Sequence, residues 1–138
     1  MIYTDTIELH TKGFSDTIDV TGRVMAIVRQ SGIDDGLVTV FCMGSTGTVT
    51  TIEYEPGAVR DMQRVIEKIV PSGIPYEHDK RWGDGNGFSH VRAALMKPSL
   101  TIPVMKKTVM LGTWQQIVFM DFDNRNRQRK IVVHIIGE

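Results

Sequence analysis

The fold is set by one apolar run, Leu37-Val38-Thr39-Val40-Phe41-Cys42-Met43. Its β-branched and aromatic residues favour a strand, and its continuous apolar character predicts a central strand that is buried on both faces. The sequence Gly44-Ser45-Thr46-Gly47 interrupts the run, and strand-favouring residues resume from Thr48 to Tyr54. We therefore expect two consecutive strands that are separated by a bend.

The residues before this run predict a strand and a helix. From Ile2 to His10, apolar and polar residues alternate, which is typical of a strand with one face in water. An amphipathic stripe follows, in which Asp16 or Thr17 can cap the start of a helix and Gly32 can end it. The stripe consists of Ile18, Thr21, Met25 and Val28.

The residues after the run predict two more helices and a strand-rich tail. One helix is expected after Pro56-Gly57, and Pro71 stops it. The segment from Pro75 to Gly87 is expected to be irregular, and a short helix with Ser89 near its start ends before Pro98. The remaining strands are expected at Leu100–Val104, Gln115–Phe122 and Arg129–Ile136. Because helices and strands do not alternate regularly, the pattern indicates one α+β domain over residues 1–138.

Composition excludes several classes of protein. The chain has 138 residues, of which 41% are hydrophobic, so it can form one domain with a proper core. Its 16 basic and 16 acidic residues cancel, so no global charge attracts nucleic acid or an anionic membrane. The single cysteine, Cys42, excludes an intramolecular disulfide and is interpreted as a small buried hydrophobe. No apolar segment is long enough to span a bilayer and the N-terminus lacks the layout of a signal peptide, so we expect a cytoplasmic protein.

Titratable residues are concentrated between Pro75 and His90. This stretch contains two histidines, three acids, an Asn, a Tyr, a Trp and three glycines. Such a segment can form a pocket, provided that it folds back to bring His78 and His90 together. The pair would then bind a metal or act as acid and base near neutral pH. The alternative is a plain loop, in which Asp84 and Asn86 are turn residues.

Two other segments contain groups that suit phosphate. The sequence Gly44-Ser45-Thr46-Gly47-Thr48 offers backbone N–H groups and hydroxyls, although it lacks the lysine of a P-loop. Near the C-terminus, Arg125, Arg127 and Arg129 alternate with polar residues, and arginine forks suit carboxylate or phosphate. The alternatives are a bend between strands and a solvated turn with ion pairs, and the second is favoured for Arg125.

Several motifs, in their order and spacing, resemble the YjbQ-like family, whose members are often described as secondary thiamine-phosphate synthases. The resemblance covers nearly the whole chain. It rests on Thr46–Glu53, Pro75-Tyr76-Glu77-His78-Asp79, Gly85-Asn86-Gly87-Phe88-Ser89-His90, Pro98-Ser99, Leu111-Gly112-Thr113-Trp114-Gln115 and Asp123–Arg129.

The resemblance implies a large mixed, mostly antiparallel sheet with about three helices, and a homotrimer. It also implies a pocket with His78, His90 and Glu53 as catalytic residues, in which His78 and His90 can hold a divalent metal such as zinc or magnesium. The implied substrate-binding residues are Ser45, Thr46, Asp84, Asn86, Ser99, Trp114, Gln115 and Arg127. One departure concerns Gly44, which stands where the family commonly has a histidine, so only two histidines remain for a metal.

We therefore expect an enzyme for a small phosphorylated molecule that resembles the thiamine-phosphate synthases. One alternative is a different metal- or histidine-dependent enzyme, and another is a non-catalytic trimeric protein that binds ligands. In each case the expected partners are a small phosphorylated ligand and further copies of the chain, with no nucleic acid and no membrane.

Overall fold

The computed structural model describes all 138 residues and contains two sheets in which every strand pair is antiparallel. The first sheet contains, in spatial order, β1 (Ile2–Thr11), β8 (Arg127–Gly137), β3 (Gly36–Cys42), β5 (Ser99–Met105) and β6 (Thr108–Val109). The second contains β2 (Asp16–Asp19), β7 (Gln116–Asp121) and β4 (Gly47–Ile52). The expected α+β fold is confirmed, with the strands divided between two sheets.

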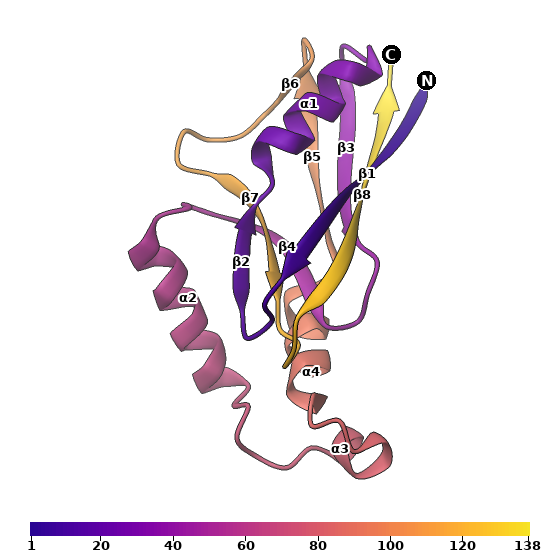
Figure 1. Cartoon of the computed structure of the whole chain (residues 1–138). Helices are drawn as coiled ribbons and strands as arrows, with labels where there is room; N and C mark the ends of the chain where they lie inside the picture. The colour runs from indigo at the N-terminus through magenta and orange to yellow at the C-terminus, as the bar shows by residue number, and fades with distance from the viewer.

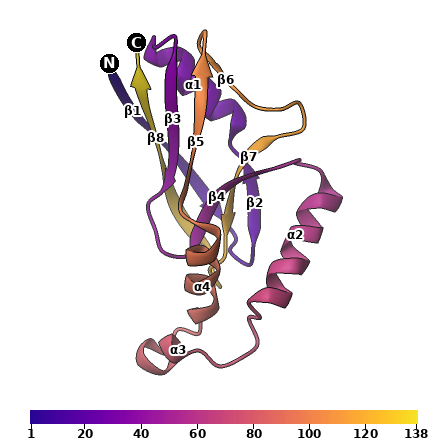
Figure 2. The ribbon, with the colours of Figure 1, turned by 180° about the vertical axis from the view of Figure 1, so that it is seen from behind.

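Four helices accompany the sheets: α1 (Thr21–Ser31), α2 (Pro56–Ile69), α3 (Glu77–Trp82) and α4 (Gly87–Met96). Helix α1 lies near the two termini, whereas α3 and α4 lie at the opposite end of the molecule (Figure 1). The reverse view shows α2 beside the second sheet and α4 below the ends of β5 and β8 (Figure 2). No helix of the structure has the length and apolar character that crossing a membrane requires.

β3 is the central strand of the first sheet, as predicted, but the strand that is buried on both faces is β7. Ile117 and Phe119 of β7 belong to the main core with α1 and the first sheet. Val118 and Met120, on the other face of β7, pack with residues of α2 and α4. In β3 the burial alternates along the strand. The prediction that β3 is buried on both faces is wrong, because helix α1 covers only one face of the first sheet.

The open face of β3 retains apolar side chains. Leu37 and Phe41 are 51% and 41% exposed in the single chain, while Val38 and Val40 are buried. Cys42 is buried as predicted, and burial raises the pKa of its thiol to about 11. The cysteine is therefore a core residue and not a nucleophile at neutral pH.

The first helix begins later than the sequence predicts. Residues Asp16 to Asp19 form strand β2, which pairs with β7, so neither Asp16 nor Thr17 caps the helix. The N-cap is Val20, and the nearby Asp19 side chain accepts a hydrogen bond from Thr21 N at 2.9 Å. Tertiary pairing with β7 thus outweighs the helical periodicity that extends to Ile18. Gly32 ends α1 in the left-handed conformation, as predicted.

The stretch from Pro75 to Gly87 is more regular than expected, because it contains α3. Gly83 ends this helix in the left-handed conformation, and Gly85 also has a positive φ angle. The chain then turns directly into α4, which begins at Gly87, so that Ser89 lies near its start as predicted. These two glycines allow the reversal that places α3 against α4.

Candidate active-site pocket

A polar pocket of about 380 Å³ lies where the β3–β4 bend, α3, α4 and β8 meet. The residues that line it come from four separate parts of the chain. They are Gly44, Ser45, Thr46, His78, Trp82, Asp84, Asn86, His90, Arg127 and Arg129. The fold therefore joins the predicted Pro75–His90 segment to both of the predicted phosphate-binding segments.

The two histidines are in contact, as the pocket hypothesis requires. The ring centroids of His78 and His90 lie 4.3 Å apart, with the planes inclined by 39°. Burial, followed by the proximity of His78, lowers the pKa of His90 below its ordinary value of 6.5. His90 is therefore a neutral imidazole at pH 7, which can accept a proton.

His78 has a buried nitrogen without a partner. Its Nδ1 atom makes no hydrogen bond and lies 3.6 Å from an oxygen of Asp84 and 3.9 Å from an oxygen of Asp79. The ligand atoms of these three residues all lie within 4.8 Å of one another. Oδ1 of the buried Asn86 also lacks a partner. Because buried polar atoms are normally hydrogen-bonded, these two atoms mark a place for a ligand.

Beneath the histidines, buried ion pairs form the floor of the pocket. Arg129 donates from Nε and Nη2 to the two oxygens of Asp121 at 2.7 and 2.8 Å. Nη2 also donates to Thr46 Oγ1 at 2.6 Å, and Thr11 Oγ1 donates to Asp121 at 2.5 Å. The Asp121 side chain is fully buried and that of Arg129 is almost so. This bidentate geometry supplies the bonds that buried charges require.

Asp123 connects this floor to the catalytic candidates. It accepts hydrogen bonds from Asn86 Nδ2 at 3.2 Å, from Asn124 N at 2.8 Å and from Arg127 Nε at 2.8 Å. Burial alone would raise the pKa of Asp123, but the bonds from Asn86, Asn124 and Arg127 outweigh burial and lower it. Asp123 is therefore ionised at neutral pH and orients both Asn86 and Arg127.

Gly44 explains how the chain differs from the expected histidine pattern. A Cβ atom at Gly44 would lie 3.0 Å from Nη1 of Arg129. A side chain at this position would require the end of the Arg129 side chain to shift by a few tenths of an ångström. In this chain, the space near residue 44 is therefore occupied by the arginine.

The pocket contains seven of the predicted site residues and leaves out four. The pocket residues are Ser45, Thr46, Asp84, Asn86, Arg127 and the two histidines. Glu53 is exposed and follows the far end of β4, and Trp114 is exposed before β7. Gln115 bonds to Gly112 and Thr51, and Ser99 pairs with Phe41 at the start of β5. The roles of these four residues stay predictions that the pocket of the single chain does not support.

Two side chains that line the pocket, Arg129 and Trp82, and the nearby Asp79 were not among the predicted site residues. Arg129 lies two positions from Arg127 on β8, and this two-residue spacing is the signal that both point to one face of the strand. Trp82 is 65% exposed and is the one large apolar side chain of the pocket. Asp79 lies in α3, with a carboxylate oxygen 3.9 Å from His78 Nδ1. The sequence carries no signal that its carboxylate faces His78.

The protein thus combines an α+β fold of two antiparallel sheets with one pocket in which titratable groups gather. The family described as UPF0047 protein YjbQ-like matches residues 5–138, and the chain belongs to this family. A UPF0047 protein of Methanothermobacter thermautotrophicus is 35% identical, covering 99% of this chain and 94% of its own. One from Archaeoglobus fulgidus is 36% identical, covering 91% and 96%.

Solved structures agree with this assignment. A YbjQ-like protein of unknown function from Sulfolobus solfataricus P2 has a TM-score of 0.95 at 29% identity, and covers 100% of this chain and 99% of its own. A YjbQ/UPF0047 protein from Clostridium acetobutylicum has a TM-score of 0.87 at 34% identity, and covers 96% and 99%. The chain therefore shares both the family and the fold of these proteins.

Asp121→Ala should lower the free energy of unfolding by about 3–5 kcal/mol, because Arg129 would remain buried without its partner. Urea unfolding measures this loss. Asp61→Ala is the matched control, since Asp61 pairs with Arg64 at 3.3 Å but both side chains are largely exposed, and its effect should be small. Equal effects of the two substitutions would contradict the role given to the buried pair.

The lowered pKa of His90 predicts a loss of stability in mild acid. The native state keeps His90 neutral below its ordinary pKa of 6.5, whereas the unfolded state already binds a proton there. The free energy of unfolding should therefore fall as the pH drops below this value. Ring proton shifts, followed by NMR, should give a midpoint below 6.5 that rises in His78→Ala. If the midpoint of His90 is the same in His78→Ala, His78 does not influence the pKa of His90.

Proposed function

We propose that this protein is an enzyme that acts on a small phosphorylated molecule, with His90 and His78 exchanging protons with the substrate. The observation that carries the proposal is the contact between the two imidazoles in the pocket that also contains Arg127. A neutral His90 is a proton acceptor at pH 7, and His78 lies close enough to pass a proton to the same ligand. Titratable groups that cluster in an open pocket do not stabilise the fold, so their clustering favours a functional role.

Free donors in the pocket suit a phosphate group. The ion pair of Arg127 with Asp123 uses Nε and Nη2, so Nη1 makes no hydrogen bond within the chain. The Ser45 hydroxyl is exposed and also makes no such bond. Both can therefore donate to phosphate oxygens. The Thr46 hydroxyl, in contrast, is already bonded to Arg129 and Asp123, so its role is to support the floor.

The exposed ring of Trp82 favours a substrate that carries a planar group. All other side chains of the pocket are polar, so the indole provides the apolar surface. The guanidinium of Arg81 lies 5.4 Å from the centroid of this ring. A heterocycle stacked on Trp82 would have its phosphate within the same cavity as Arg127.

The resemblance suggests one reaction to test, the coupling of a heterocycle to an alcohol activated as its pyrophosphate ester. A ring nitrogen would attack the carbon that bears the pyrophosphate. A C–N bond would form, the C–O bond would break, and pyrophosphate would leave with the electron pair. In this proposal Arg127 and Ser45 hold the anionic group, and a protonated histidine gives its proton to the leaving pyrophosphate.

His78→Ala and His90→Ala should each lower kcat by at least about 100-fold, because a positioned general acid or base contributes that much. The assay uses hydroxymethylpyrimidine pyrophosphate and thiazole phosphate. Trp82→Ala should mainly raise KM. The control is His134→Ala, since His134 bonds to Thr4 on the open face of the first sheet. Wild-type activity in both histidine variants would refute the proposal.

A second candidate is a metal-dependent enzyme, which one observation favours. The buried, unpartnered Nδ1 of His78 is close to carboxylate oxygens of Asp79 and Asp84. One imidazole and two carboxylates fit zinc, manganese or magnesium. The proposed ligands are therefore His78, Asp79 and Asp84, in place of the expected pair of His78 and His90. His90 contacts the His78 ring, but its nitrogen atoms do not belong to this group of ligand atoms. A bound cation would polarise a phosphate or activate a water molecule.

Metal binding is tested on protein purified without added metal. Elemental analysis should find a substantial fraction of an equivalent per chain, and less than about a tenth would argue against a site of useful affinity. Calorimetric titration with zinc should show binding that Asp84→Asn weakens by about tenfold or more. Asp61→Asn is the control for a general effect of lost surface charge.

The expected homotrimer stays a proposal, as does the cytoplasmic location. The open face of the first sheet supports self-association, because Ile2, Leu37, Phe41 and Ile136 are exposed there in the single chain. A non-catalytic ligand-binding role remains the third alternative. It would be favoured by phosphate binding without any turnover.

A further inference from the structure

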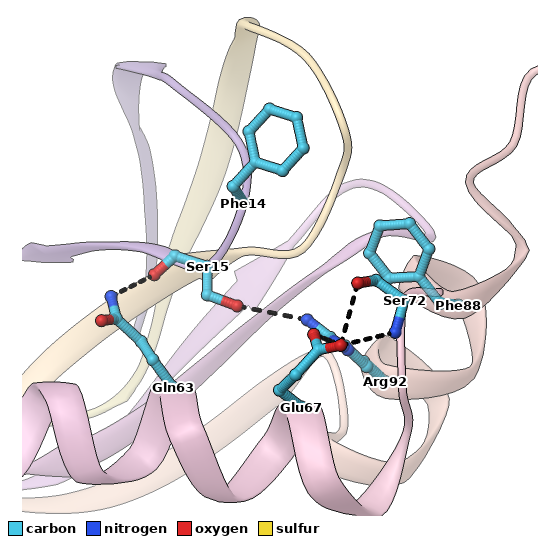
Figure 3. A pocket seen from close by; sticks show the side chains of 7 residues that line it. All are labelled: Phe14, Ser15, Gln63, Glu67, Ser72, Phe88 and Arg92. Atoms are coloured by element: carbon cyan, nitrogen blue, oxygen red, sulfur yellow. Dashed lines mark hydrogen bonds and ion pairs between the residues drawn. The ribbon is translucent and has the colours of Figure 1, made fainter. Parts of the chain in front are cut away.

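A second cavity of about 370 Å³ lies on the side of α4 that faces away from the histidines. Phe88 and Arg92 of α4 line it, whereas Asn86 and His90 line the first pocket. At about 100° per residue these two sets fall on different faces of the helix. The opposite wall comes from α2 and from the turn between β1 and β2 (Figure 3). None of its residues belongs to the histidine pocket.

The turn at the mouth of this cavity is strained. Gly13, Phe14 and Ser15 have φ angles of 70°, 52° and 65°, a conformation that is unfavourable for a bulky residue such as Phe. Backbone hydrogen bonds from Phe14 and Ser15 to the carbonyls of Asp123 and Asp121, both at 2.7 Å, hold the turn. Phe14 is nevertheless 68% exposed, so packing of its side chain does not offset the strain. Figure 3 shows its ring above Ser15, projecting away from the protein interior.

Inside the cavity, Arg92 is only 3% exposed. Its Nε and Nη2 atoms donate to Val70 O at 3.0 and 2.8 Å, and Nη2 also pairs with Glu67. Nη1, in contrast, has a single weak bond to Ser15 Oγ, at 3.4 Å. The guanidinium thus connects α4 to the end of α2 and still has donor capacity on the side of Ser15.

The side chains that line the cavity leave hydrogen-bond donors and one acceptor free. Glu67 is occupied by Arg92 and by the backbone and hydroxyl of Ser72, and these groups and Arg92 balance its charge. The Ser15 hydroxyl accepts from Arg92 and can still donate. Gln63 donates to Ser15 O at 2.8 Å, which leaves its carbonyl oxygen as a free acceptor. Two donors therefore lie beside one acceptor, in a pocket without net charge.

We propose that this cavity is a second small-molecule site, which binds an uncharged planar heterocycle carrying an amide or lactam group. The ligand carbonyl accepts from Arg92 Nη1 and Ser15 Oγ, and its N–H donates to Gln63 Oε1. Its ring packs against Phe14. The Arg92 charge is already paired with Glu67, and a carboxylate in the same position has no N–H to donate to Gln63 Oε1, so the site distinguishes an amide from the corresponding acid. This inference does not depend on the proposed enzyme activity.

The test compares nicotinamide with nicotinate as probes of the full chain, followed by backbone amide shifts in NMR. Nicotinamide should cause saturable shifts at Phe14, Ser15 and Arg92 at millimolar concentrations, and nicotinate should bind about tenfold more weakly or not at all. His90→Ala should leave this binding unchanged, which separates the second site from the histidine pocket.

Two variants complete the test. Phe14→Gly should weaken nicotinamide binding and at the same time raise the urea midpoint, because glycine adopts the positive φ angle without strain. Gln63→Leu should weaken binding with little change in the urea midpoint. Equal binding of the two probes, shifts that avoid the cavity, or full affinity in Phe14→Gly would overturn the proposal.

Discussion

The ion pair between Asp121 and Arg129 is the interaction on which the rest of the molecule depends. Asp121 ends β7 in the second sheet, and Arg129 lies on β8 in the first. Because both side chains are buried, their pairing joins the two sheets at the end where α3 and α4 lie. Thr11 of β1 and Thr46 before β4 add bonds to the same pair. One salt bridge thus fixes the relative position of four strands and forms the floor of the pocket.

The chemistry of the pocket follows from this floor. Asp123 lies two residues beyond Asp121 and extends the network to Asn86 and Arg127. The charges of Arg129 and Arg127 are balanced by those of Asp121 and Asp123. A substrate therefore contacts a pocket floor without net charge, in which one arginine donor is free. The same ion pairs hold Arg129 beside Gly44. A single arrangement of ion pairs therefore accounts for the geometry of the pocket floor.

Sequence periodicity predicted the element types well where local preference and tertiary packing agree. The apolar stripe of α2 and the strands of the C-terminal half are examples. It failed at Asp16–Asp19, since pairing with β7 is a long-range effect that the local pattern cannot report. Sequence periodicity also assigned burial on both faces to β3, whereas β7 has it. An apolar run indicates that a strand is buried, but not whether other elements pack on one of its faces or on both. Residue chemistry identified the histidine pair, but the orientation of Asp79 and the burial of Arg129 depend on contacts between distant segments.

Helix α3 contributes no buried residue to the core, whereas β7 is among the most buried strands of the chain. His78 therefore belongs to an element that can open without unfolding the domain, while His90 lies on a helix with five buried residues. The two imidazoles come from regions of unequal local stability. Amide exchange would distinguish these regions, with fast opening of α3 above a slowly exchanging floor. Movement of α3 would therefore leave the charged framework of the pocket floor undisturbed.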